Sequence, residues 1–128
     1  MAYAYDDQNI FAKILRGEIP NTTVVETEHS LAFHDIAPKA PVHVLVIPKG
    51  RYVNAEHFGA EASEAELADF ARTVARVARE TGVAESAGGN GFRTISNAGT
   101  DGVQEVPHYH VHVLGGRGLG PMLAAPTG

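Results

Sequence analysis

Three histidines near the C-terminal end of this chain alternate with single aromatic or apolar residues, in the order His108-Tyr109-His110-Val111-His112. Side chains alternate between the two faces of a β-strand, so this spacing predicts a strand over 108–114 with all three imidazoles on one face. Successive imidazoles would lie about 7 Å apart along that strand. The intervening residues would face a core on the other side. The chain must therefore build a sheet with one histidine-lined face.

Three interpretations of this histidine row are open. It can be a polar, half-exposed strand face, although three histidines are more than such a surface needs. It can bind a metal, because neutral imidazole is the commonest metal ligand, but no carboxylate stands at an obvious companion spacing. It can act on a phosphate ester or amide, because one imidazole can attack while another donates a proton. The glycine-rich segment 97–104 before the strand offers amides to a phosphate and favours this third interpretation.

The remaining segments predict two helices and four further strands. Apolar residues at helical spacing begin at Ile10, and Gly17 ends that run. A capping box of Ser63 and Glu66 opens a second helix, whose apolar stripe continues to Gly82. The further strands are expected at 22–27, 31–36, 43–47 and 92–97. Their hairpin-like links favour an α+β fold with an antiparallel sheet of about five strands, because a parallel sheet would alternate strand and helix.

Length and composition fit one domain over 1–128, with 1–8 as a flexible lead and 117–128 as an irregular tail. Apolar residues make up 44% of the chain, too many for a disordered protein. The net charge of −5, without a basic run, argues against nucleic-acid and membrane partners. The absence of cysteine excludes disulfides and thiolate metal sites. Neither a signal peptide nor a membrane-length apolar run is evident, so a cytoplasmic location is expected.

The histidine row and five further blocks, all in the correct order, resemble the histidine-triad superfamily and in particular its Hint-like branch of purine nucleoside phosphoramidases. The further blocks are 10–20, 31–36, 41–49, 97–102 and 114–117. Together they cover most of 9–117. The resemblance implies the histidine-triad α+β fold, assembled as a homodimer whose sheet continues across the two-fold axis, with the long helix near the interface.

The resemblance also implies an enzyme that hydrolyses nucleoside 5′-phosphoramidates at the P–N bond. His110 would attack the α-phosphorus and become nucleotidylated, and water would then release the nucleoside monophosphate. Two alternatives stay open. One is a dinucleoside polyphosphate hydrolase or nucleotidyl transferase of the same superfamily, and the other is a nucleotide-binding scaffold protein with weak catalysis.

The resemblance further implies roles for the residues around His110. His112 would contact phosphate oxygens, while His108 and His43 would orient the nucleophile and relay a proton to the leaving amine. Asp35 would hold the ribose hydroxyls. The purine pocket would consist of Ile10, Phe11, Phe33, His34 and Ile36. The phosphate and leaving-group side would consist of Asn97, Gly102, Val103, Gln104 and Glu105. Without the resemblance, the apolar members would fit a plain core equally well, and Asp35 could simply cap a turn.

Several positions depart from the family's pattern. Many relatives carry two cysteines in the first helix that help bind zinc; Asn9 and Ala12 stand there, so neither structural zinc nor another cofactor is expected. Val103 replaces a frequent second glycine, which predicts a different shape for the phosphate loop. Glu105 stands where some relatives have a serine near the leaving group. The tail lacks the tryptophan found at some C-termini, so a different leaving-group preference is expected.

Overall fold

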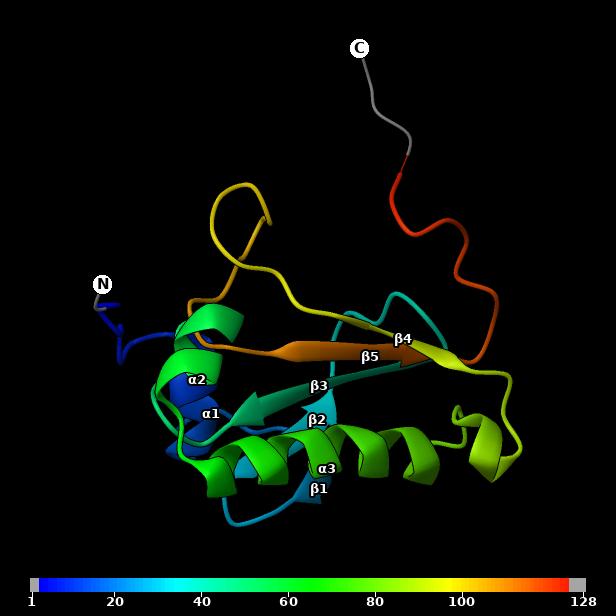
Figure 1. Ribbon diagram of the computed structural model, residues 1–128, viewed down its shortest axis with the longest axis horizontal. Coiled ribbons are helices and arrows are strands. Elements are labelled where there is room, and N and C mark those ends of the chain that lie inside the picture. The colour runs from blue at the N-terminus through cyan, green and yellow to red at the C-terminus, as the bar shows by residue number, and fades with distance from the viewer. Residues whose placement is uncertain (1–2, 125–128) are drawn as a thin grey trace.

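The computed structural model describes residues 3–124, which form an antiparallel sheet with helices packed against it (Figure 1). The strand order is β1 (Thr23–Glu26), β2 (Ser30–His34), β3 (Val42–Pro48), β5 (Val111–Gly115) and β4 (Phe92–Ile95). All four neighbouring pairs are antiparallel. The predicted α+β fold with about five strands is therefore confirmed.

The helices are α1 (Ile10–Leu15), α2 (Ala55–Glu61), α3 (Glu64–Glu80) and the short 3-10 helix η1 (Glu85–Ala87). The sequence predicts α1 and α3, but the expectation of only two helices misses α2. This helix has seven residues, too few to display an apolar stripe. Its one clear sequence signal is the N-cap residue Asn54, whose side chain accepts a hydrogen bond from the His57 amide at 3.0 Å.

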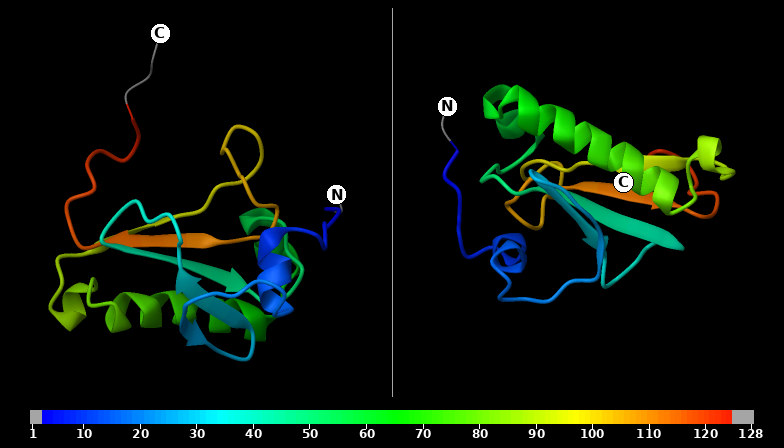
Figure 2. Two further views of the ribbon diagram at one scale, coloured as in Figure 1. Left: turned by 180° about the vertical axis from the view of Figure 1, so that it is seen from behind. Right: turned by 90° about the horizontal axis from the view of Figure 1, so that it is seen from below.

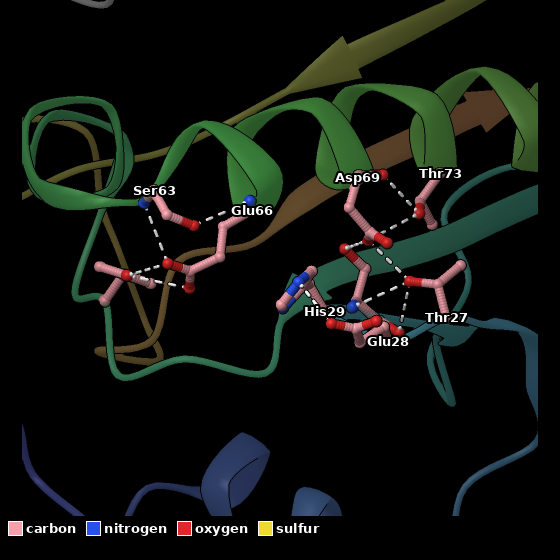
Figure 3. Close-up of polar contacts among 9 residues, drawn as sticks. Thr27, Glu28, His29, Ser63, Glu66, Asp69 and Thr73 are labelled. Atoms are coloured by element: carbon pink, nitrogen blue, oxygen red, sulfur yellow. Dashed lines mark hydrogen bonds and ion pairs between the residues drawn. The ribbon is translucent and has the colours of Figure 1, made fainter.

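Polar side chains fix α3 at its start and along its length (Figure 3). The Ser63 hydroxyl accepts from the Glu66 amide at 3.1 Å, and the Glu66 carboxylate accepts from the Ser63 amide at 3.0 Å, as the capping box predicts. One turn later, the Asp69 carboxylate accepts from the hydroxyls of Thr27 and Ser30 at 2.7 and 2.6 Å. These bonds attach α3 to Thr27 in the turn between β1 and β2 and to Ser30 at the start of β2.

The central strand β3 is buried on both faces, because helices cover the two sides of the sheet (Figure 2, right). Val44 and Val46 pack with Phe70 of α3 on one face. Leu45 packs with Phe11 of α1 on the other. This second face also carries the histidines, so α1 and not the long α3 borders the candidate site.

Strand boundaries agree with the sequence prediction to within two residues, except at the start of the last strand. β5 begins at Val111 rather than at 108. The Tyr109 amide donates to the Tyr52 carbonyl at 2.7 Å, so this part of the chain is held by the segment after β3 and not by the sheet ladder.

Neither terminal segment of the described chain forms a helix or strand, but residues 3–8 are closely attached to the domain. Tyr3 stacks on His57, and Tyr5 hydrogen-bonds to His108. Of the expected irregular tail, 125–128 lie outside the described residues. Among residues 3–124, every helix is too short or too polar to cross a bilayer.

Candidate active site

Strand register brings a fourth histidine beside the predicted row. In the ladder between β3 and β5, His43 pairs with Leu114 and Leu45 pairs with His112, so His43 and His112 lie diagonally on one face. Nε2 of His43 is 2.9 Å from Nδ1 of His112. The His110 ring follows, with its centroid 5.1 Å from that of His112. His43, His112 and His110 therefore form a continuous row of imidazoles.

A cavity of about 740 Å³ opens over this row, on the face opposite α3. Most of the expected site residues line it: Ile10, Phe11, Phe33, His34, Asp35, Ile36, His43, Asn97, Val103, Glu105, His110 and His112. The chain also contributes lining residues that were not predicted: Ile14, Ile19, Pro20, Asn21, Lys39, Leu45, Ile95, Val106 and Leu114. Lys39 is the charged member of this second group. Its position in the turn four residues before His43 is the signal that could have identified it.

Three expected site residues do not line the cavity: Gly102, Gln104 and His108. The Gln104 side-chain amide donates to two backbone carbonyls, at 2.6 and 3.0 Å, so it braces the loop. A Cβ on Gly102 would lie 2.5 Å from the Ala98 carbonyl oxygen, so this glycine permits a close turn. Gly102 and Gln104 therefore shape loop 97–105 in this structure, and their contact with substrate stays a prediction.

Val103 has an unusual backbone in that loop. Its φ is +55°, a left-handed conformation that a β-branched residue enters only with strain. The side chain is 68% exposed at the cavity. The loop therefore keeps a glycine-like backbone at Val103 and presents an apolar side chain there.

His108 is fully buried and both of its ring nitrogens are hydrogen-bonded. Nε2 lies 2.8 Å from the Pro48 carbonyl oxygen, which can only accept, so Nε2 carries the proton. Nδ1 of the neutral ring must then accept, and the Tyr5 hydroxyl donates to it at 2.6 Å. A direct proton relay through His108, as expected from the resemblance, is therefore not available in this arrangement.

His110 is held in the tautomer that a nucleophile needs. Its Nδ1 lies 2.7 Å from the His108 carbonyl oxygen, so Nδ1 donates and carries the proton. Nε2 of the neutral ring then has a free lone pair, and no protein group in the described part of the chain hydrogen-bonds to it. Phe11 packs edge-on against the ring, with centroids 5.0 Å apart, and limits its rotation.

His112 is held in the complementary tautomer. The Lys39 amide donates to Nδ1 of His43 at 3.1 Å, so neutral His43 carries its proton on Nε2. That N–H donates to Nδ1 of His112. Neutral His112 must then carry its proton on Nε2. The cavity therefore contains an imidazole lone pair on His110 beside an imidazole N–H on His112.

All four imidazoles are neutral near pH 7, because burial disfavours their charged forms. Burial lowers the pKa of His108 to about 4, against the favourable contact with the Pro48 carbonyl. Burial, assisted by the neighbouring His110 and His43, lowers the pKa of His112 to about 4. Burial also lowers the pKa of His43 and of His110, while the Asp35 carboxylate opposes both shifts.

The fold supplies the carboxylate that the sequence spacing does not reveal. An Asp35 side-chain oxygen lies 3.4 Å from Nε2 of His43, and its other oxygen accepts from the Ala37 amide at 2.8 Å. Potential metal-ligating atoms of Asp35, His43 and His112 all lie within 4.8 Å of one another. The sequence-based inference that no carboxylate lies near the histidine row is therefore wrong, because the fold brings Asp35 beside His43.

The hydrogen bonds nevertheless oppose a metal ion at this group. A metal-bound imidazole nitrogen must be unprotonated, and its second nitrogen then donates. The Lys39 amide donates to Nδ1 of His43, so Nε2, the atom facing Asp35 and His112, is the protonated one. The group is thus arranged as a hydrogen-bonded chain from His43 to His112, with the Asp35 carboxylate beside it.

Comparison with known proteins gives matches in both sequence and structure. The family described as HIT domain matches residues 16–119. An uncharacterized 13.2 kDa HIT-like protein of Azospirillum brasilense is 58% identical over 96% of this chain and 98% of that protein. The purine nucleoside phosphoramidase of Escherichia coli is 42% identical over 92% of this chain and 95% of that protein. Among solved structures, a HIT family hydrolase from Clostridium thermocellum aligns with a TM-score of 0.77 and 38% identity, covering 92% of this chain and 98% of that one.

Proposed function

Because this chain belongs to the HIT domain family, we propose that it is a hydrolase of nucleoside 5′-phosphoramidates, cleaving the P–N bond to release a nucleoside monophosphate and an amine. The observation that carries this proposal is the pairing of tautomers in the cavity. His110 offers a lone pair, and His112 offers an N–H. A tetrahedral phosphate between them can be attacked on phosphorus while one of its oxygens accepts a hydrogen bond.

The reaction would proceed in two steps. Nε2 of His110 forms a bond to the α-phosphorus, the P–N bond breaks, and the leaving nitrogen takes up a proton from water. The His110 ring then carries the nucleotidyl group on Nε2 and keeps its Nδ1–H bond to the His108 carbonyl. In the second step water attacks the phosphorus and the bond from phosphorus to Nε2 of His110 breaks. The proton that this water loses neutralises the hydroxide left by the first step, so the nucleoside monophosphate is released and His110 is again neutral.

The rest of the cavity fits a nucleoside. Ile10, Phe11 and Phe33 supply an apolar wall for a purine base. Asp35, with an oxygen already beside His43, would accept hydrogen bonds from the ribose hydroxyls. We expect the nucleotide to be a small-molecule substrate, and neither a nucleic acid nor a membrane to be a partner.

A steady-state panel tests the proposal against the two alternatives. Adenosine and guanosine 5′-phosphoramidates and dinucleoside polyphosphates are assayed before and after exhaustive chelation. The phosphoramidates should give the highest kcat/KM, unchanged by chelation. A preference for dinucleoside polyphosphates would favour the related hydrolases, binding of adenosine monophosphate without turnover would favour a scaffold, and recovery only with added zinc would favour a metal enzyme.

Asp35→Ala is expected to weaken the binding of adenosine monophosphate about ten- to a hundredfold, because a hydrogen bond to a charged acceptor contributes about 1.5–3 kcal/mol. Isothermal titration calorimetry measures the change. A 2′,3′-dideoxy nucleotide should lose little affinity, since it lacks the hydroxyls that Asp35 would bind.

Glu28→Ala is the matched control, because it removes the same charge from a side chain that is 82% exposed in the turn before β2. This variant should bind like the wild type. Equal losses for the ribose and dideoxy nucleotides with Asp35→Ala would contradict a ribose contact.

We also expect a homodimer, with the sheet continuing across the edge strand β4 and α3 near the interface. Phe92 and Ile95 on that edge are 43% and 37% exposed. Light scattering at micromolar concentration should give about twice the 13.5 kDa chain mass. Phe92→Glu should shift the protein toward monomer, whereas Met122→Glu, at another exposed apolar side chain, should not. A monomeric wild type would contradict this expectation.

A further inference from the structure

Residues 3–8, here called the N-terminal strap, lead into α1 (Figure 1), and the Tyr3 side chain contacts α2. Each of its two tyrosines contacts one histidine of the domain. The Tyr3 ring stacks on His57, with centroids 5.0 Å apart, and its hydroxyl donates to Glu56 of α2. The Tyr5 hydroxyl donates to Nδ1 of His108 at 2.6 Å.

Further contacts hold Tyr5 in place. The Arg51 guanidinium lies over its ring, 5.2 Å from the centroid, and also pairs with Asp7 of the strap. The Asn9 side-chain amide donates to the Asp6 carbonyl at 2.7 Å. The Tyr5 hydroxyl is thus presented to His108 by a fixed segment of the chain.

The contact matters because His108 has no alternative hydrogen-bond donor from solvent. Its side chain is completely buried, with 0% exposure, and Tyr5 supplies the donor for Nδ1 while Pro48 supplies the acceptor for Nε2. Removing the Tyr5 hydroxyl leaves an unsatisfied nitrogen in a dry environment, which favours a shift of the ring or of its backbone. The backbone carbonyl of this same residue is the acceptor that fixes His110.

We propose that Tyr5 is a positioning residue for the nucleophile: its hydroxyl holds the buried His108 in place, and the His108 carbonyl in turn holds His110 with Nε2 unprotonated and facing the cavity. Tyr5 itself does not line that cavity. This inference rests on the proposed nucleophilic role of His110, and it predicts an effect on the chemical step without an effect on substrate binding.

Tyr5→Phe removes the hydroxyl and keeps the ring, so the stacking against Arg51 survives. Its kcat on adenosine 5′-phosphoramidate, in single-turnover and steady-state assays, should fall about five- to tenfold with KM nearly unchanged, as for the loss of one orienting hydrogen bond. Tyr3→Phe is the matched control, because it removes the other strap hydroxyl from its contact with Glu56. It should keep wild-type kcat and KM.

Long-range ¹H–¹⁵N correlation spectra of histidine-labelled protein test the geometry without using activity. In the wild type, His108 should be the Nε2–H tautomer and stay neutral down to about pH 5, while His110 should be the Nδ1–H tautomer. Tyr5→Phe should move the His108 Nδ1 signal and broaden or shift that of His110, and Tyr3→Phe should leave both unchanged.

The results of these experiments distinguish a failure of the positioning role of Tyr5 from a failure of the proposed function. A wild type with the expected tautomers but no phosphoramidase activity would overturn the function and leave the positioning contact supported. An Nδ1–H tautomer of His108 in the wild type would overturn the inference whatever the activity, and it needs no variant. Wild-type kcat in Tyr5→Phe, or an equal loss in Tyr3→Phe, would also overturn it.

Discussion

Replacement of His110 by alanine is expected to lower kcat by about 10³- to 10⁵-fold while leaving the affinity for adenosine monophosphate within a fewfold of the wild type. The large effect follows from the hydrogen bonds. Among the cavity imidazoles, His110 is the one whose Nδ1 donates to a carbonyl, which leaves Nε2 with a free lone pair. His43 and His112 both carry their proton on Nε2, so neither can replace it without a change of tautomer.

The covalent intermediate gives this prediction a second readout. Wild-type enzyme quenched during turnover, under conditions that protect acid-labile phosphoramidates, should carry a nucleotidyl adduct on His110 by peptide mass spectrometry. His29→Ala is the control, because this histidine lies in the turn before β2 and not in the cavity; it should keep both turnover and adduct. Near-normal turnover by His110→Ala, or an adduct on His108 or His112, would contradict the assignment.

Local sequence patterns predict several elements of the fold, including the strand that carries His112 and the start of α3. The alternation at His108, His110 and His112 predicts one shared face because a strand has a period of two residues. His110 and His112 do line one cavity, whereas His108 precedes β5, is fully buried and does not line it. The capping box at Ser63 likewise predicts the start of α3, because both of its hydrogen bonds join residues three apart.

Contacts between distant residues could not be predicted in this way. The 2.9 Å contact of His43 with His112 depends on the register of β3 against β5, which single-strand patterns do not specify. The approach of Asp35 to His43 depends on the same sheet, since the end of β2 lies beside β3. For this reason the sequence suggests that the histidine row has no carboxylate nearby, although the fold provides one.

The N-terminal strap makes another contact between distant residues that local sequence patterns do not predict. Residues 1–8 form too short a segment to give a helix or strand pattern, and the sequence predicts a flexible lead there. Tyr5 nevertheless contacts His108, which is 103 positions away in the sequence. Gln104 is a related case: the family resemblance implies a substrate contact, but its side chain donates to two backbone carbonyls.

His112→Ala is expected to lower kcat about 10²- to 10³-fold, a smaller loss than for His110→Ala, because removal of one donor to a developing oxyanion costs this much in other enzymes. The predicted donor is the Nε2–H group, whose tautomer is set by the bond from His43 to Nδ1. His112→Gln should lose less than the alanine variant, since a side-chain amide can still donate. Steady-state and single-turnover rates on adenosine 5′-phosphoramidate measure both variants.

The nucleotidyl adduct on His110 tests whether His112 acts as a hydrogen-bond donor and not as the nucleophile. In His112→Ala the lone pair of His110 remains, because the bond from Nδ1 of His110 to the His108 carbonyl does not involve His112. The His110 adduct should therefore still form, more slowly, and its mass should be found on the same peptide as in the wild type. If His112→Ala forms no adduct and loses as much activity as His110→Ala, the two imidazoles act as one unit and the division of roles between them is wrong. If His112→Ala keeps wild-type rates, the phosphate does not accept a hydrogen bond from Nε2 of His112, and stabilisation of its charge must come from another group in the cavity.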